Sequence, residues 1–315
     1  MQLQQEDHMK WKLIFIILLA LILLPVAAYF LVNPEKNVLD EATRNRLGGT
    51  YIKLSHGMTH YKLSGPENGK VVVLVHGATI PIWTWDSLSA ELSTAGFRVL
   101  SYDAYGRGYS DRPDLAYDQA LFQHQLLDLI DALALSEPFD IVGLSLGAGT
   151  AVNFTAQHPE QVSKLILIQP IINNFKVPSF FGIPVLGELL GRFFGIRVIV
   201  SRVAKQFENN PAAETYTRLF IEQTTYKGFE KSILSMLRND AVQDYSDAYR
   251  MVGKQQREVL LIWGKQDPEI TEGMIDLIRS LIPHVTFEPV AGVAHGIVFQ
   301  QPEVVNRLIR EFIAP

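Results

Sequence analysis

A serine framed by glycines is the residue whose surroundings most suggest chemistry. Ser145 stands in Gly143-Leu144-Ser145-Leu146-Gly147, between an apolar strand-like run and a run of small residues with helical character. A serine in a sharp strand-to-helix turn exposes its hydroxyl, and glycines two positions before and after it keep neighbouring chains from clashing. The pattern alone leaves two interpretations open, a nucleophile or an ordinary tight turn.

A reactive Ser145 would need a base and a third group that orients the base, because a serine hydroxyl is a weak nucleophile. Asp267 follows the apolar run VLLIWG, and His295 follows VTFEPV one helix and one strand later. The carboxyl ends of parallel strands meet at one edge of a sheet, so these three residues can come together there. Glu269 is a second candidate for the acid, because it stands two residues after Asp267.

An acyl-transfer reaction at Ser145 would also need hydrogen-bond donors for the oxygen anion that develops. The backbone amide of Leu146 directly follows the serine, and that of Ala78 follows His76-Gly77 at the end of the strand-like run KVVVLV. We expect these two amides to form an oxyanion hole, with Gly77 and His76 supporting the loop.

Other conspicuous residues are interpreted as structural. We expect Gly149 to let the helix after Ser145 pack close to the sheet, and Asp103 with the loop GRGYSDRP to fix a turn beneath the site. The remaining histidines have no comparable context and are expected at the surface or in loops: His56, His60, His124, His158 and His284. The sequence has no H-E-x-x-H motif and no clustered ligands, so we expect neither a metal nor a cofactor.

Strand-like and helical runs alternate from residue 49 to 315, which predicts an α/β domain with a doubly wound, mostly parallel sheet. The alternation breaks at about 171–247, where Phe, Gly and Pro are frequent and several helices follow. A long insertion in a compact domain is usually functional, so we expect a helical cap. Phenylalanines in this insertion would line an acyl-binding pocket or form the cap's own core: Phe175, Phe180, Phe181, Phe193 and Phe194.

Five motifs in this order resemble the α/β-hydrolase superfamily: HGAT, YDAYGRGYSDRP, GLSLGAG, WGKQD and GVAHG. The resemblance covers about residues 51–315 and is greatest to small esterases, lipases and carbon–carbon bond hydrolases with a cap after the sixth strand. It implies Ser145 as nucleophile, His295 as general base and acid, and Asp267 rather than Glu269 as the orienting acid. Gln169 ends a strand where some relatives carry their acid, and an amide there favours Asp267.

These motifs specify the fold better than the substrate. A serine nucleophile argues against haloalkane dehalogenases and epoxide hydrolases, relatives that attack with an aspartate. We expect an acyl-enzyme mechanism acting on carboxylic esters of lipophilic or acylglycerol type. Two alternatives stay open: hydrolysis of a carbon–carbon bond in ring-cleavage products, which uses the same triad, and a catalytically silent protein that binds a ligand.

Residues 13–32 are uncharged and apolar over a length that spans a hydrocarbon core of about 30 Å. We expect a transmembrane signal anchor here, between an N-terminal tail (1–12) and a linker (33–48) that is either extended or forms a short helix. The small residues VAA at 26–28 leave a cleavable signal peptide open. Basic residues on the two sides are nearly balanced, so the positive-inside rule only leans towards a cytoplasmic N-terminus. The catalytic domain is accordingly expected to be exported, on a single-pass anchor or secreted after cleavage.

The overall composition restricts the partners. The 315 residues are 48% hydrophobic with a net charge of −5, and charges of both signs are spread along the chain. A nucleic-acid partner would need a basic stripe, which is absent from the sequence. The sequence has no cysteine, which excludes disulfides, thiol catalysis and cysteine-ligated metals. The expected partners are therefore a small lipophilic ester and, through residues 13–32, a membrane.

Overall fold

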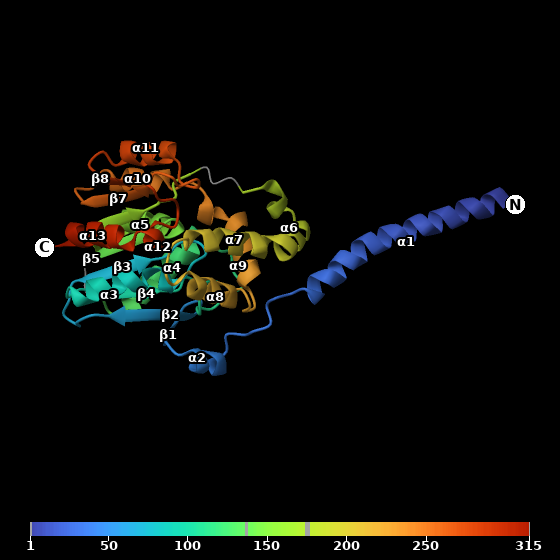
Figure 1. Cartoon of the computed structure of the whole chain (residues 1–315), viewed down its shortest axis with the longest axis horizontal. Helices are drawn as coiled ribbons and strands as arrows, with labels where there is room; N and C mark the ends of the chain where they lie inside the picture. The colour runs from blue at the N-terminus through green and yellow to red at the C-terminus, as the bar shows by residue number, and fades with distance from the viewer. Residues whose placement is uncertain (1, 136–137, 174–176, 315) are drawn as a thin grey trace.

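An eight-stranded sheet forms the centre of the protein in a computed structural model that describes residues 2–135, 138–173 and 177–314 (Figure 1). The strand order is β1-β2-β4-β3-β5-β6-β7-β8. β2 pairs antiparallel with β1 and β4, and every other neighbouring pair is parallel. The mostly parallel α/β sheet expected from the sequence is thereby confirmed. The strands are β1 (Thr50–Leu54), β2 (Gly57–Ser64), β3 (Val71–Val75), β4 (Arg98–Tyr102), β5 (Phe139–Leu144), β6 (Val162–Ile168), β7 (Val259–Gly264) and β8 (Thr286–Val290).

Helices cover both faces of this sheet, which explains why the central strands are continuous apolar runs. Every residue of β3, β5 and β7 is buried, as expected when a parallel sheet is enclosed on two sides. The buried side chains of α4, α5, α10 and α11 pack on one face, and those of α3 and α13 pack on the other. These helices are α3 (Asp86–Thr94), α4 (Gln119–Ala132), α5 (Leu146–Gln157), α10 (Ser246–Val252), α11 (Glu272–Leu281) and α13 (Pro302–Ile313). Two short helical segments flank them, η1 (Ile82–Trp85) and α12 (Ile297–Gln300).

The chain between β6 and β7 forms the expected helical insertion, which lies beside the sheet at the end nearer to α1 (Figure 1). Its elements are η2 (Ser179–Gly182), α6 (Leu186–Leu190), the π-helical turn η3 (Gly191–Gly195), α7 (Ile196–Gln206), α8 (Ala213–Gln223), α9 (Phe229–Arg238) and η4 (Asp240–Val242). We call this insertion the cap. Ser246 and Asp247 were expected within it, but they begin α10, which packs against α5 on the sheet.

The N-terminal segment forms one long helix, α1 (Gln2–Leu31), that projects away from the rest of the molecule (Figure 1). The stretch His8–Leu31 of this helix is long and apolar enough to cross a membrane, and none of it is buried. The helix also includes residues 2–12 of the expected N-terminal tail, which contain neither Pro nor Gly. The helix ends at Leu31, one residue before the expected limit of the anchor.

The expected linker contains a short helix, α2 (Glu41–Leu47). Asp40 precedes α2, and its carboxylate accepts the backbone amide of Thr43 at 2.8 Å. A carboxylate in this position satisfies one of the free amides of the first helical turn.

Candidate active site

Ser145 lies at the sharp turn between β5 and α5. Its φ of 54° and ψ of −115° fall in a region that costs a non-glycine residue about 1–3 kcal/mol. The backbone amide of Ser145 donates to the carbonyl of Ile168 at 2.9 Å, which helps to hold the turn. Close packing excludes side chains on the flanking glycines: a Cβ on Gly147 would lie 2.3 Å from the carbonyl oxygen of Val75, and one on Gly143 would lie 2.4 Å from that of Gly147. The surrounding fold thus imposes the strained turn.

His295 lies between Ser145 and Asp267 and is hydrogen-bonded to both. Its Nε2 is 3.2 Å from Oγ of Ser145, and its Nδ1 is 2.7 Å from Oδ2 of Asp267. Asp267 follows β7 and His295 follows β8, so the parallel strands bring both side chains to the edge at which β5 ends. An ionised carboxylate only accepts hydrogen bonds, so Nδ1 carries a proton and Nε2 is free to accept the proton of the serine hydroxyl.

The carboxylate of Asp267 is buried, and both of its oxygens are hydrogen-bonded. Oδ1 accepts the backbone amides of Glu269 at 2.7 Å and Ile270 at 3.1 Å, while Oδ2 faces His295. The side chain of Glu269, the second candidate for the acid, forms an ion pair with Arg202 of the cap at 2.6 Å. The geometry therefore favours Asp267 over Glu269 as the partner of the histidine.

The surroundings of His295 raise its pKa above the usual value. Burial alone lowers this pKa, but the hydrogen bond and the negative charge of Asp267 outweigh the effect of burial. The same interactions stabilise the imidazolium, which is the form that a base reaches after it accepts a proton. His295 is therefore placed to take a proton from Ser145 and to return it.

Two backbone amides beside Ser145 have no acceptor within the part of the chain that the structure describes, those of Ala78 and Leu146. Leu146 begins α5, and the first amides of a helix lack intrahelical acceptors. Ala78 follows Gly77, where an added Cβ would lie 3.5 Å from Cβ of Ser145. Both residues line the same cavity as the serine, so their amides can receive an oxygen anion formed there.

His76 supports the loop that carries Ala78. Its Nε2 accepts the backbone amide of Ala104 at 2.9 Å, and its Nδ1 donates to the carbonyl of Gly77 at 2.7 Å. Burial lowers the pKa of His76 to about 4. His76 is therefore neutral at neutral pH, with both ring nitrogens hydrogen-bonded to the backbone.

Arg107 holds the same loop from the other side, and sequence reasoning did not single it out. Its Nε donates to the carbonyl of Ala78, and its Nη1 donates to Oγ of Ser232 in α9 at 2.6 Å. Burial lowers the pKa of Arg107 to about 10, so the guanidinium stays charged at neutral pH. It forms no salt bridge with any carboxylate in the described residues. The only sequence signal was its position between the glycines of the GRG turn.

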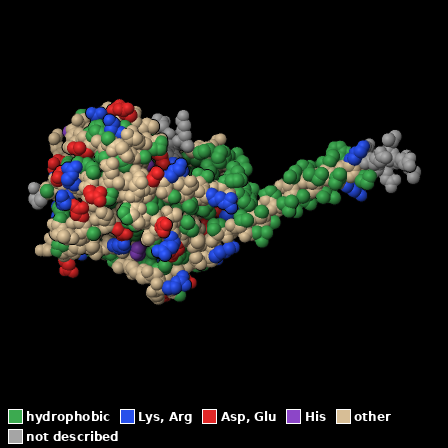
Figure 2. Space-filling view, in the orientation of Figure 1, with side chains coloured by type: hydrophobic (Ala, Val, Ile, Leu, Met, Phe, Trp, Pro, Cys, Tyr) green, Lys and Arg blue, Asp and Glu red, His purple; other side chains and the backbone are tan. Residues whose placement is uncertain are grey.

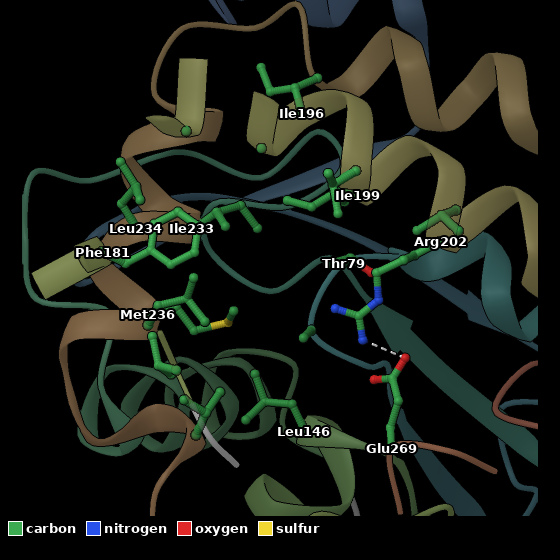
Figure 3. Close-up of a pocket in the computed structure, with 18 of the residues that line it drawn as sticks. Thr79, Leu146, Phe181, Ile196, Ile199, Arg202, Ile233, Leu234, Met236 and Glu269 are labelled. Carbon is green, nitrogen blue, oxygen red and sulfur yellow. Dashed lines mark ion pairs between the residues drawn. The ribbon is translucent and has the colours of Figure 1, made fainter. Parts of the chain in front are cut away.

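An apolar cavity of about 740 Å³ lies above Ser145, between the cap and the sheet edge (Figure 3). Leu146 and Thr79 line it from the sheet side, and Figure 3 shows cap side chains converging from the other side. The cap contributes mainly apolar residues, including Phe180, Phe181, Phe194, Ile196, Ile199, Ile233, Leu234 and Met236. Of the two interpretations left open for these phenylalanines, Phe180, Phe181 and Phe194 fit the pocket lining. Phe193 is not among the lining residues, and Phe175 lies outside the described residues.

Charged side chains in this cavity are few. Arg202 and Glu269 face each other on one wall (Figure 3), and Glu230 pairs with Arg192 of the cap. Among the residues that the structure describes, no group of three or more metal-ligand side chains is placed to hold an ion. The cavity therefore suits an apolar group next to a small polar centre.

The packing changes two structural expectations, those for Gly149 and His60, and agrees with a third, that for Asp103. The lack of a side chain at Gly149 makes room for the ring of Tyr245 rather than for the sheet, because a Cβ on this glycine would lie 2.7 Å from that ring. His60 is buried in β2 rather than exposed, and its Nδ1 is 2.7 Å from Oδ2 of Asp103. The expected role of Asp103 itself is confirmed, since its carboxylate also accepts the amides of Ile82 and Tyr109, both at 2.8 Å, and so fixes the turn.

Gln169 has a role that the sequence did not predict. Its side chain donates to the carbonyl of Ala294 at 2.9 Å and accepts the amide of Gly264 at 3.2 Å. It therefore links the end of β6 to the end of β7 and to the loop that carries His295.

A mostly parallel sheet with a strained serine at its carboxyl edge is typical of α/β hydrolases. A sequence model of the alpha/beta hydrolase family matches residues 72–308, so the chain belongs to this family. It is 26% identical over 223 residues to a 2-hydroxymuconate semialdehyde hydrolase of Pseudomonas putida, covering 69% of this chain and 77% of that protein. It is 25% identical over 266 residues to carboxylesterase YbfK of Bacillus subtilis (strain 168), covering 84% and 86%.

Among solved structures, a bacterial membrane phospholipase A has the same fold, with a TM-score of 0.69 at 19% sequence identity. That likeness covers 98% of both chains, so it includes the N-terminal helix as well as the hydrolase domain. Family membership supports hydrolase chemistry, and the named relatives cleave more than one kind of bond.

Proposed function

We propose that this protein is a membrane-anchored serine hydrolase that cleaves carboxylic esters of lipophilic, acylglycerol-type substrates. The observation that carries the proposal is the hydrogen-bonded series Ser145, His295 and Asp267, of which Ser145 and His295 line an apolar cavity. Similarity to a carboxylesterase over 84% of the chain supports an ester substrate.

In the proposed mechanism, Nε2 of His295 accepts the hydroxyl proton as Oγ of Ser145 attacks the acyl carbon. Asp267 keeps the proton on Nδ1 and stabilises the imidazolium. The oxygen anion of the tetrahedral intermediate accepts hydrogen bonds from the amides of Ala78 and Leu146. His295 then returns its proton to the leaving alcohol, and the acyl-enzyme forms.

The second half of the reaction reverses these proton transfers. His295 removes a proton from a water molecule, whose oxygen attacks the acyl carbon and forms a second tetrahedral intermediate. Its collapse breaks the bond to Oγ, and the proton on Nε2 passes to Ser145. A carboxylic acid leaves and the starting enzyme is restored.

The substrate class rests on the lining of the cavity and on α1. Phenylalanine, isoleucine and leucine side chains suit an acyl chain, and a lipid-like ester is the substrate most accessible to an enzyme held at a membrane. The proposed arrangement is a retained single-pass anchor with a cytoplasmic N-terminus and an exported catalytic domain.

A carbon–carbon bond hydrolase is the second candidate, because the relative in Pseudomonas putida carries that kind of name. Ring-cleavage products are anionic, and a site for them needs a cation. Arg202 is the one basic side chain, other than His295, among the described residues that line the cavity, and Glu269 already neutralises it. This pairing favours a neutral substrate over an anionic one.

The test is a panel of p-nitrophenyl esters of increasing chain length, a thioester, an anilide and a ring-cleavage dienoate, assayed with purified protein. We expect ester hydrolysis to dominate, with rates rising from acetate to medium or long acyl chains. Ser145→Ala is the control, and it should be folded and inactive. Dienoate cleavage faster than any ester would establish the second candidate instead.

A further inference from the structure

The cap carries an exposed apolar surface that its own packing does not explain. Six apolar side chains between positions 180 and 198 are 39% to 63% exposed. Figure 2 shows apolar side chains gathered at the end of the body from which α1 extends. A contiguous apolar patch of this kind on a protein surface marks a contact with another apolar phase. We call it the cap face, and it consists of Phe180, Ile183, Val185, Leu186, Phe194 and Val198.

The cap face is continuous with the cavity above Ser145. Phe180, Phe194 and Val198 belong to both, since each is exposed at the surface and also lines the cavity. An acyl chain that leaves an apolar phase at this surface would reach the cavity along apolar side chains. It would not have to cross water.

The membrane-length helix α1 ends against the same part of the cap. α1 contacts α6, and the guanidinium of Arg192 lies 4.3 Å from the ring centroid of Tyr29 near the end of α1. Arg192 also donates to the Tyr29 hydroxyl at 3.2 Å and forms a buried ion pair with Glu230 in α9. The end of α1 is therefore attached to the cap.

The segment after α1 is held by the cap as well. The carboxylate of Glu35 accepts the backbone amides of Gly228 at 3.0 Å and Glu230 at 2.6 Å, at the start of α9. Asn37 pairs with the segment before α9, accepting the amide of Lys227 at 2.9 Å and donating to the carbonyl of Thr225 at 3.0 Å. These contacts fix the orientation of the cap relative to α1, so a bilayer spanned by α1 would meet the cap face first.

We propose that the cap face lies in the headgroup and acyl boundary of the bilayer spanned by α1, and that the cavity takes its ester substrate from that bilayer. The inference rests on the proposed function and deepens it, because it names the substrate as a membrane-resident acyl ester. Apolar side chains at the end of a membrane-spanning helix are stabilised by entering this boundary.

The absence of cysteine from the chain permits a direct test of where the cap face lies. The full-length Ile183→Cys variant is labelled at the new cysteine with the polarity-sensitive fluorophore NBD. The labelled protein is then reconstituted into phosphatidylcholine nanodiscs with one protein in each disc. The control is Met251→Cys in α10, an exposed apolar position on the sheet side of the molecule, away from α1 (Figure 1). We expect a blue-shifted emission and protection from aqueous iodide at position 183, and neither at position 251.

Other occupants of the cap face give different results in the same experiment. Equal quenching at the two positions would overturn the proposal. So would protection at position 183 that develops only with two proteins in a disc, since a second copy would then cover the surface. Protection that requires an added protein would assign the surface to a protein partner and contradict the bilayer.

Activity provides the second test, with variants outside the cavity lining. Ile183→Gln combined with Leu186→Gln should keep p-nitrophenyl butyrate hydrolysis unchanged and lower monoolein hydrolysis in phosphatidylcholine vesicles about tenfold, because two apolar side chains no longer enter the boundary. Met251→Gln should change neither rate. A parallel change in both substrates, or none in either, would contradict uptake from the bilayer. Failure of the unaltered protein on both substrates would instead contradict the proposed function.

Discussion

His295 is the side chain whose protonation state the proposed reaction depends on most. Its Nε2 must be unprotonated to accept the proton of Ser145, and the charge of Asp267 raises its pKa above the usual 6.5. Activity should therefore be lost as the pH falls through this raised pKa and should level off above it. The measurement is kcat/KM for a soluble ester between about pH 5 and 9, with the inflection expected above pH 6.5.

Two carboxylate variants identify the residue that sets this inflection. Asp267→Asn removes the charge that stabilises the imidazolium, so the inflection should move to lower pH and the rate should fall about 10⁴-fold. Glu269→Gln removes the partner of Arg202 rather than that of His295, and it should keep most of the activity. The opposite order of losses would make Glu269 the acid.

Arg107 gives a prediction about positioning rather than proton transfer. Its guanidinium holds the carbonyl of Ala78, so Arg107→Met should displace the neighbouring amide and lower kcat about tenfold to a hundredfold with little change in KM. Arg107→Lys keeps the charge and should restore part of kcat. A thermal unfolding scan accompanies both variants, because a loss of kcat that only follows loss of folded protein would contradict the positioning role.

Among the elements, the join between β5 and α5 tolerates the least change. Gly147→Ala would place a Cβ 2.3 Å from the carbonyl oxygen of Val75, and we expect it to cost about 1–3 kcal/mol of unfolding free energy. Gly182→Ala in η2 is the matched control, since an added Cβ there meets nothing within 4 Å. The unfolding midpoints of the two variants in one detergent give the comparison, and equal midpoints would contradict the packing of this turn.

The elements also show which parts of the site were predictable from the sequence. Ser145, Asp267 and His295 each follow a strand in a local pattern that is recognisable from a few residues, so their meeting at one edge could be inferred. The contact of Arg107 with Ser232 joins segments 125 residues apart, and no local sequence pattern in either segment indicates it. His60 was placed at the surface for the same reason, because its partner Asp103 comes from another strand end.

At the scale of the whole molecule, the segment after α1 belongs to the cap rather than to a free tether. The carboxylate of Glu35 accepts backbone amides more than 190 positions away in sequence. Such distant contacts leave no local pattern in the sequence, which explains why a linker was expected there. A carboxylate that satisfies the amides at a helix start contributes about 1–2 kcal/mol, so this segment should stabilise the cap.

Two truncated forms measure that contribution. Removal of residues 1–28 deletes most of α1 but keeps Tyr29 and its contact with Arg192, and this form should keep soluble-ester activity and its unfolding midpoint. Removal of residues 1–39 also deletes Glu35 and Asn37, and it should unfold at lower temperature with reduced activity. Glu35→Gln in the full-length protein checks the assignment, and equal midpoints for the two truncated forms would show that the segment does not stabilise the cap.

The central claim is that Ser145 is a nucleophile activated by His295. The most direct measurement is labelling of the folded full-length protein with a fluorophosphonate, followed by mass spectrometry of its peptides. The predicted result is stoichiometric modification of Ser145 that slows as the pH falls and disappears in Ser145→Ala and His295→Ala. Folded protein that stays unlabelled at Ser145, or that is labelled equally in His295→Ala, would contradict the claim.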